Sequence, residues 1–457
     1  MMSKKGIVFM VVFALGLVGS GFSAVENIKV SGDHTTMVVN RSEFGLGSSS
    51  ILGLTPEGVN QINVTGSVTN LRFDADLTEE VFGTVVIRDQ RVWGSDNDLY
   101  LGEGYVTLKD IFDYPLTVKL GLQPVVLGSG MLVGDPDTNR TADNTSPFGG
   151  SVLFGGGNTN YIGDLSPDKS FEGVVATYDI NPDIKANLTL AYLKPYEGYG
   201  DSDDDSDILA IYLSSGILPT TLGELYFVYK ETDKQTPAEI FGGGDVGNVG
   251  IRLLSQPVEN LGLSGEFIYQ YGKGEVDPVS FLLPPFAPAP MRADGKARSD
   301  IAFSVGAQYA IPNVEWSPVI QIGYGACSEN WDPMYESVTS GRIINAIFAN
   351  TNGSVITLGL TLKPREDISL GLNYVRAKLW KKIGVYASDY SYLLASLGQL
   401  DSEKKHIGDE IDFTLGYDYT EDVKLGLNVD YFKPGKLFTD LNDKAAFQTL
   451  ASLKVSF

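Results

Sequence analysis

The chain has 457 residues with 57 acidic and 34 basic side chains, a formal net charge of −23 at pH 7. A chain this acidic repels polyanions unless its basic groups are clustered, so we expect no nucleic-acid partner. It contains 52 Gly, 22 Phe and 23 Tyr but only two His and one Cys, so no intramolecular disulfide can form. This composition is unlike that of a helical enzyme.

The first 24 residues have the pattern of a secretory signal peptide. Lys4 and Lys5 precede the apolar run GIVFMVVFALGLVG, which the small residues of GFSA follow. This order of basic, apolar and small-residue regions predicts cleavage after Ala24, and the apolar run is too short to be read as a permanent membrane helix. We therefore expect a signal peptide at 1–24 and one exported domain at 25–457.

From residue 27 onward, about eighteen segments alternate apolar and polar side chains. In the segment 300–311, DIAFSVGAQYAI, every second residue from Ile301 to Ile311 is apolar, whereas Gln308 lies in the other series. Residues two apart share a face of a strand, so each segment predicts a strand with one apolar face. The same pattern recurs at 261–271, 411–419 and 423–431.

The strand count follows from the two outermost segments. With a first strand near 27–40 and a last strand at 447–457, we expect about eighteen strands, with sixteen as the alternative. Within 61–74 the apolar series changes parity near Asn70, which predicts a β-bulge there.

The connections between these segments alternate in length. Short turn-like sequences such as LTEE (77–80) and TED (420–422) alternate with longer stretches, namely 128–170, 197–206, 232–245, 274–299, 327–353, 381–406 and 434–446. Transmembrane barrels have short periplasmic turns, long outer loops and an even number of strands. The sequence therefore predicts an all-β fold, an antiparallel up-and-down transmembrane barrel of the bacterial outer membrane with long extracellular loops.

A secreted β-sandwich or solenoid is the alternative, because its sheets would also have one apolar face. Aromatic residues at the predicted strand ends favour the barrel, since Tyr and Trp concentrate at membrane interfaces; they are Tyr178, Tyr269, Tyr271, Tyr324, Tyr417, Tyr419, Tyr431 and Trp380. The last strand, AFQTLASLKVSF, ends on Phe457, which resembles the signal that barrel-assembly machinery recognises. Expected partners are that machinery, outer-membrane lipid and lipopolysaccharide.

Charged residues decide which face meets lipid. A basic side chain on the lipid face at mid-bilayer costs roughly 2–4 kcal/mol, so the series that carries the charges is expected to face water. A barrel of this size leaves an aqueous channel unless a loop narrows it. By parity, the predicted pore-lining residues are Arg72, Asp74, Arg88, Lys119, Gln123, Glu266, Gln308, Gln321, Glu410, Asp412, Lys424 and Asp430. Asp412, Lys424 and Asp430 could instead pair with one another across neighbouring strands.

The longest connection, 128–170, is the candidate constriction loop. It is rich in Gly, Asn and Asp, and it could fold into the bore or lie over the outer mouth. The stretch GDSDDDSD places Asp201, Asp203 and Asp205 in a predicted outer loop; it lacks the Gly and the later Glu of an EF-hand, so a weak divalent site or a solvated acidic loop both fit.

We expect no cofactor and no enzymatic activity. The two His residues, His34 and His406, are not accompanied by a G-x-S-x-G motif or a similar catalytic constellation.

Three stretches carry a family resemblance: PLTVKLGLQPVVLGSGMLVGD (115–135), FEGVVATYDI (171–180) and GDEIDFTLGYDYTEDVKLGLNVDYFKPG (408–435). They resemble the alginate export family of outer-membrane barrels, and the third stretch is the most specific. The resemblance implies an eighteen-stranded monomeric pore for passive passage of a saccharide. Leu122, Met131 and Val175 stand where members of that family commonly have Arg, which suits a uronate-conducting pore.

The sequence as a whole predicts an outer-membrane, porin-like channel for passive diffusion of small hydrophilic solutes or saccharides. The acidic excess favours cations or neutral solutes. An export pore for an anionic polysaccharide such as alginate is one alternative, and a surface adhesin or receptor barrel that uses its long loops is another.

Overall fold

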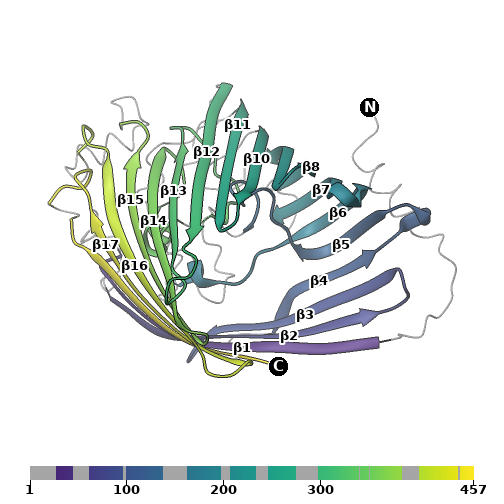
Figure 1. The fold of residues 1–457 in the computed structure, drawn as a ribbon, viewed down its shortest axis with the longest axis horizontal. Coiled ribbons are helices and arrows are strands. Elements are labelled where there is room, and N and C mark those ends of the chain that lie inside the picture. The colour runs from purple at the N-terminus through teal and green to yellow at the C-terminus, as the bar shows by residue number, and fades with distance from the viewer. Residues whose placement is uncertain are drawn as a thin grey trace.

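The fold is a closed antiparallel β-barrel. The computed structural model describes residues 27–44, 61–95, 99–136, 162–196, 206–232, 245–273, 297–338, 340–348, 350–382, 401–440 and 443–457. Within these residues, eighteen strands form one sheet that closes on itself, because β18 pairs with β1 as well as with β17. Figure 1 shows the chain running around the wall from purple to yellow, with the C-terminus beside β1. The predicted up-and-down barrel is confirmed, with eighteen strands and not sixteen.

The strands have the following bounds. The first nine are β1 (Asn27–Ser42), β2 (Gln61–Asp76), β3 (Val81–Val92), β4 (Tyr100–Leu108), β5 (Leu116–Pro124), β6 (Ser170–Asn181), β7 (Ala186–Tyr196), β8 (Ser206–Leu218) and β9 (Thr221–Thr232). The other nine are β10 (Val246–Val258), β11 (Leu261–Lys273), β12 (Ala297–Ala310), β13 (Val319–Cys327), β14 (Gly353–Arg365), β15 (Ile368–Leu379), β16 (His406–Asp418), β17 (Val423–Pro434) and β18 (Ala446–Ser456).

Helical structure is sparse in the described part of the chain. It consists of three 3-10 turns, η1 (Ile111–Asp113), η2 (Gly163–Leu165) and η3 (Pro182–Ile184), and one short α-helix, α2 (Arg342–Ile347). No helix among the described residues is long and apolar enough to cross a bilayer. The short connections, such as 77–80 between β2 and β3 and 419–422 between β16 and β17, all join strands at one end of the barrel, hereafter the short-turn end.

The register separates an apolar outer face from a polar inner face. Directly opposed residues in a ladder share a face, so each face can be followed from strand to strand. On β13 and β15 the outward series includes Ile320, Ile322 and Leu372, with relative exposures of 50%, 54% and 49%. An apolar belt this extensive on an isolated chain marks a surface that another apolar medium or a partner covers.

Strand β2 shows why the predicted β-bulge near Asn70 is wrong. The register of β2 is continuous with both β1 and β3, so no residue is inserted. The apolar series changes face for a packing reason: Val64 and Val68 point inward, where they pack in a cluster with Ile162. Phe73, near the short-turn end, faces outward, opposite Val30 of β1 and Val85 of β3.

The barrel closes along a single seam between β1 and β18. The register runs from Ser42 opposite Phe447 to Asp33 opposite Ser456. Beyond this ladder, the Gly32 amide donates to the Phe457 carbonyl at 2.8 Å and the Phe457 amide donates to the Gly32 carbonyl at 3.0 Å. A Cβ on Gly32 would lie 2.7 Å from the Phe457 ring, so this ring covers a position that only glycine leaves free.

Candidate functional site: the lumen and its inward segments

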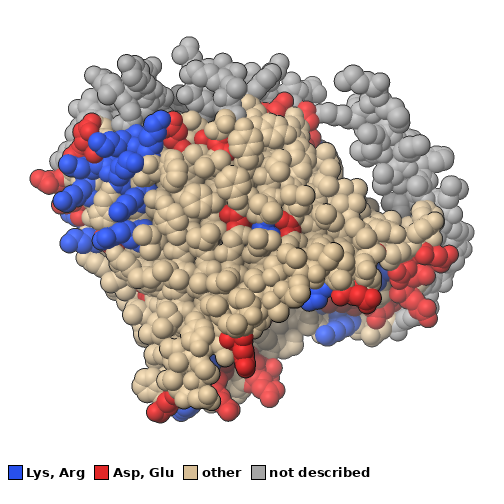
Figure 2. Space-filling view, turned by 45° about the horizontal axis from the view of Figure 1, so that its top comes forward, with Lys and Arg blue, Asp and Glu red and all other residues tan. Residues whose placement is uncertain are grey.

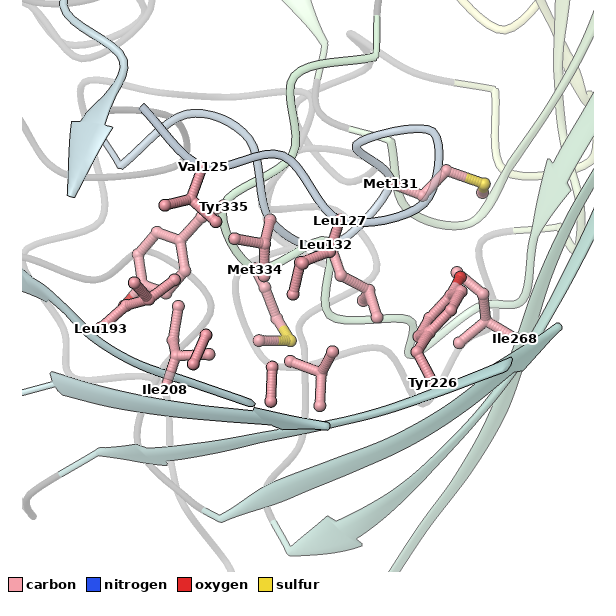
Figure 3. Packing of buried hydrophobic residues seen from close by; sticks show 14 of the residues in the cluster. Val125, Leu127, Met131, Leu132, Leu193, Ile208, Tyr226, Ile268, Met334 and Tyr335 are labelled. Atoms are coloured by element: carbon pink, nitrogen blue, oxygen red, sulfur yellow. The ribbon is translucent and has the colours of Figure 1, made fainter. Parts of the chain in front are cut away.

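In the described part of the chain, two connections fold into the barrel, which is too wide for its own side chains to fill. The first inward segment is residues 125–136, after β5, and the second is residues 328–338 with 340–348, between β13 and β14. The apolar side chains of 125–133 and of 331–335 are buried in one cluster with the inner wall of β6 to β13. Figure 3 shows Leu132 and Met334 above Ile208, which points toward them from its strand. Part of the candidate loop 128–170 therefore lies inside the barrel; residues 137–161 lie outside the described residues.

The two inward segments hold each other through their backbones. Val133 pairs with Tyr335 in a parallel bridge. The Tyr335 amide donates to the Leu132 carbonyl at 2.9 Å, the Gly134 amide donates to the Tyr335 carbonyl at 2.8 Å, and the Ser337 amide donates to the Gly130 carbonyl at 2.8 Å. These bonds satisfy backbone groups that the barrel wall does not reach, so the segments form one internal unit.

Glu266 anchors the first inward segment to the wall. This carboxylate lies on the inner face of β11, is 4% exposed, and accepts hydrogen bonds from the Tyr226 hydroxyl and from the Ser129 amide at 3.3 Å. Gly128 has a φ of +61°, and a Cβ there would lie 2.3 Å from a Glu266 oxygen. The turn at 128–129 thus requires glycine for both its backbone conformation and its close approach to the carboxylate.

The second inward segment is tied to β9 and β11. Lys230 and Asp332 form an ion pair at 2.8 Å, with side-chain exposures of 3% and 1%. The Gln270 side chain donates to the Asp332 carbonyl at 2.9 Å and accepts from the Asp332 amide at 2.8 Å. The ion pair is buried, and Gln270 bonds to the Asp332 backbone beside it. A buried charge is tolerated when it is paired and surrounded by hydrogen bonds in this way.

Helix α2 is held by carboxylates of β16 and β17. The two oxygens of Glu410 accept from the Ile343 and Ile344 amides, each at 2.7 Å. Arg342 donates to Asp430 at 2.8 Å and to the Thr414 hydroxyl at 2.8 Å. Free N–H groups at a helix start are satisfied by an acceptor from outside the helix, and Glu410 supplies it.

A further stretch, residues 162–168, lies against the inner wall of β1 to β4. Asp164 accepts two bonds from Arg41, at 2.8 and 2.7 Å, and this arginine is 1% exposed. Asp168 pairs with Arg88 and accepts from the Tyr100 hydroxyl at 2.6 Å. Both ends of the loop that follows β5 are therefore fixed inside the barrel, on opposite parts of the wall.

Open space remains toward the short-turn end. A cavity of about 1490 Å³ is lined by the inner faces of β8 to β14, including Arg252, Gln308 and Gln321. A smaller cavity of about 450 Å³ lies between the inward segments and β12 to β15. Gly323 and Thr357 line both, so the two cavities are adjacent.

The register places all twelve predicted pore-lining residues in the inner series, but the structure divides them by role. Four hold inward elements: Arg88, Glu266, Glu410 and Asp430. Gln123 and Asp412 bond to the wall itself, and Arg72 and Asp74 pair with each other. Four are exposed to the lumen: Lys119, Gln308, Gln321 and Lys424.

The alternative of direct pairing among Asp412, Lys424 and Asp430 is also resolved. Asp412 and Asp430 lie opposite each other, but Asp412 accepts from Asn373 at 3.2 Å and Asp430 pairs with Arg342. Lys424 pairs across the same two strands with a different residue, Asp418, at 3.4 Å. The two facing carboxylates are thus stabilised by other groups.

Sequence reasoning missed the second inward segment, which was expected to be an ordinary outer loop within 327–353. Its anchors Lys230, Asp332 and Arg342 were missed with it. The available signal was the composition of this stretch: Trp331 and Phe348, 0% and 7% exposed, are large apolar residues in a connection that would otherwise face water. An apolar loop in a wide barrel indicates a loop that packs inside it.

The remaining candidates lie apart from this site. His34 bonds to the Thr69 and Thr36 hydroxyls on the outer face. His406 lies 3.0 Å from Asp409 at the end of the barrel that carries the long connections. The acidic candidates Asp201, Asp203 and Asp205 lie outside the described residues. No group of three or more His, Cys, Asp or Glu side chains in the described part of the chain could hold a metal ion.

An eighteen-stranded closed barrel with an apolar outer wall and a polar lumen has the architecture of outer-membrane porins. No protein-family model matches the sequence, and no curated protein matches it. Solved structures of Pseudomonas aeruginosa proteins do match it. The structure of OccK11 (OpdR) has a TM-score of 0.56 at 12% identity, and the match covers 95% of this chain and 97% of that one.

Two further structures from the same organism give the same result. OpdO has a TM-score of 0.57 at 10% identity, covering 95% of this chain and 98% of that one. OprD has a TM-score of 0.53 at 9% identity, with 96% and 98% covered. At these identities the similarity establishes the fold, that of OprD-type porin structures.

Proposed function

We propose that this protein is an outer-membrane channel for passive diffusion of small hydrophilic solutes or saccharides, and that it prefers cations and neutral solutes to anions. The observation that carries the proposal is the pairing of an apolar outer wall with a polar lumen that is narrowed by inward segments but not filled. Such a barrel conducts water-soluble molecules when it spans a bilayer. The similarity to porin structures supports the same conclusion.

The lining of the larger cavity favours neutral polar solutes. The inner residues of β11 to β14 there are small or uncharged, and include Ser264, Gln308, Gln321 and Thr357. Gly262, Gly306 and Gly323 add no side-chain bulk. Hydroxyl and amide groups exchange hydrogen bonds with sugar hydroxyls without a net charge, so a small saccharide suits this wall.

The cation preference rests on carboxylates without a basic partner. Among the described residues, no basic group lies within ion-pair distance of Glu266, Asp300 or Asp412, although each has hydrogen-bond donors nearby. All three are on the inner face, around the inward segments. Fixed negative charge in a narrow, low-dielectric passage attracts cations and repels anions.

Export of an anionic polysaccharide such as alginate is the alternative that the sequence resemblance suggests, and the comparisons do not support it. Of the three positions where that family commonly has Arg, Leu122 lies in the outward series of β5, so a side chain there does not reach the lumen. Met131 is buried in the first inward segment and Val175 is apolar on the inner wall. A uronate would meet no arginine at these positions.

A planar-bilayer recording of the purified, refolded chain tests the channel. We expect stepwise ohmic conductance, with a reversal potential in a KCl gradient that indicates cation preference. An anion-selective reversal potential would contradict the preference and favour the polysaccharide alternative. A barrel that folds and inserts without conductance would contradict the channel and favour the adhesin or receptor alternative.

The proposal includes two earlier steps, export across the inner membrane and assembly in the outer membrane. We propose that residues 1–24 are removed on export and that assembly machinery recognises the strand ending at Phe457. N-terminal sequencing of the protein from an outer-membrane fraction tests the first step, with Val25 expected as the first residue. Deletion of Phe457 tests the second and should lower the amount of folded barrel in that fraction.

A further inference from the structure

Eight basic residues of this acidic chain are clustered at one place on its outer surface. Figure 2 shows a group of Lys and Arg side chains over the ends of β15 to β17, on the side of the long connections. This basic collar consists of Arg376, Lys378, Lys381, Lys382, Lys404, Lys405, Lys433 and Lys436, all of which are exposed. In a chain with a net charge of −23, such a cluster requires a specific explanation.

The collar lies directly above the apolar belt. On the outer face, Tyr374, Ile411 and Tyr431 form one row across β15, β16 and β17. The next row toward the long connections is Arg376, Asp409 and Lys433. The surface therefore changes from aromatic and aliphatic to basic within one step of the ladder. Such a change is typical of the boundary between the acyl chains and the headgroups of a membrane.

The collar retains free positive charge after its internal pairs are counted. Asp409 accepts from Arg376 at 2.7 Å, Glu329 pairs with Lys381 at 2.6 Å, and Glu403 pairs with Lys382 at 2.8 Å. Among the described residues, no acid lies within ion-pair distance of the other five collar residues, which are Lys378, Lys404, Lys405, Lys433 and Lys436. Two of these, Lys378 and Lys433, are on the strands themselves and point outward.

The opposite rim has the opposite charge. Exposed carboxylates occupy the short connections at Glu79, Glu80, Asp110, Asp113, Asp183, Glu259, Glu315, Glu366, Glu421 and Asp422. The collar thus belongs to the long-connection side only, which faces the exterior in outer-membrane barrels.

We propose that the basic collar binds the phosphate groups of a phosphorylated glycolipid of the outer leaflet, such as lipopolysaccharide. Its acyl chains would lie against the outward row of Leu372, Phe413 and Val429. Each basic residue at a membrane surface adds to the attraction for anionic lipid, so several together select for it. This inference rests on the proposed placement in the outer membrane.

The test compares two triple variants of the full chain, folded in zwitterionic detergent. The collar variant is R376Q/K378Q/K433Q, and the charge-matched control is K109Q/K185Q/K363Q, three exposed lysines at the short-turn end. Each is titrated with bisphosphorylated lipid A, with the same lipid after removal of both phosphates and with soluble polyglutamate, and the bound molecules are counted by native mass spectrometry. Heat-modifiable migration on gels verifies that each variant is folded.

We expect the collar variant to bind the phosphorylated lipid at least tenfold more weakly than the unmodified chain, with the control variant unchanged. Equal binding by the collar variant, or equal binding of the dephosphorylated lipid, would overturn the inference. Tighter binding of soluble polyglutamate than of lipid would also overturn it and point to a soluble partner.

Conductance of the same preparations separates the two proposals. Weakened lipid binding with normal conductance in the collar variant supports the collar and leaves the channel intact. Absent conductance in the unmodified chain contradicts the channel, whereas equal lipid binding by both variants contradicts the collar alone.

Discussion

Single glycines decide how closely the inward segments approach the wall. At Gly341, just before α2, a Cβ would lie 2.6 Å from a Glu410 oxygen. That carboxylate cannot move aside freely, because it holds the Ile343 and Ile344 amides. Close packing of this kind leaves no room for one extra methyl group.

We therefore predict that Gly341→Ala lowers the free energy of unfolding by about 1–3 kcal/mol, through displacement of α2. The control is Gly83→Ala on β3, where an added Cβ meets nothing within 4 Å and the change should stay within about 0.5 kcal/mol. Urea unfolding in detergent, followed by tryptophan fluorescence, measures both. Equal effects at the two positions would contradict the role given to Gly341.

The buried pair of Lys230 and Asp332 gives a second residue-scale prediction. Lys230→Met leaves a buried carboxylate without its cation, and should lower the free energy of unfolding by about 3–5 kcal/mol. Lys119→Met is the matched control, because that lysine is exposed on the inner wall. The double variant Lys230→Met, Asp332→Leu should recover part of the loss, and a double variant as unstable as the single one would argue against the pair.

The sequence predicts which side chains face the lumen wherever the barrel wall alone determines their orientation. Glu266 and Gln308 lie in the inner series because charged and amide groups avoid the lipid-facing side, and alternation reveals that side. Parity misled where a loop packs on the wall, as at Val68, since Ile162 comes from a distant part of the chain. The partners of Glu410 and Lys230 could not be predicted either, because they also come from a loop that is distant in the sequence.

At the scale of elements, the second inward segment controls the width of the lumen. Its helix α2 and its bridge to the first segment occupy space that the barrel would otherwise leave to water. Because its anchors come from β9, β11, β16 and β17, the segment spans the bore.

Replacement of residues 333–348 by a short Gly-Ser linker should therefore raise single-channel conductance severalfold. The same change exposes the carboxylates of Glu410 and Asp430 to the lumen, so cation preference should rise as well. Planar-bilayer recordings of both variants check the two effects, with folding verified by heat-modifiable migration. A deletion that folds but conducts like the unmodified chain would show that the segment does not narrow the path.

The elements themselves were more predictable than their contacts. Turn residues mark the short connections, and strand length and alternation mark the strands, so β12 and β17 fall close to their predicted bounds. Long connections carry no comparable signal. Whether 128–170 enters the bore depends on the side chains that meet it there, such as Glu266 and Arg88, and not on its own composition.

For the whole molecule, the charge distribution predicts a salt-dependent selectivity. The screening length falls from about 10 Å at 0.1 M salt to about 3 Å at 1 M. Carboxylates around the inward segments then act over a shorter range, so the cation-to-anion permeability ratio should fall toward unity as KCl is raised. Reversal potentials at a fixed gradient ratio check this, and a ratio independent of salt would place the selectivity in direct ion binding.

The seam between β1 and β18 has a kinetic consequence. Every other pair of neighbouring strands is joined by a local connection, whereas Ser42 and Phe447 meet across nearly the entire polypeptide. The entropy lost on forming a contact grows with the length of chain it encloses, and contacts between distant residues slow folding. Hairpins can therefore form early and in any order. Pairing of β1 with β18 is the slow last step, and it closes the barrel.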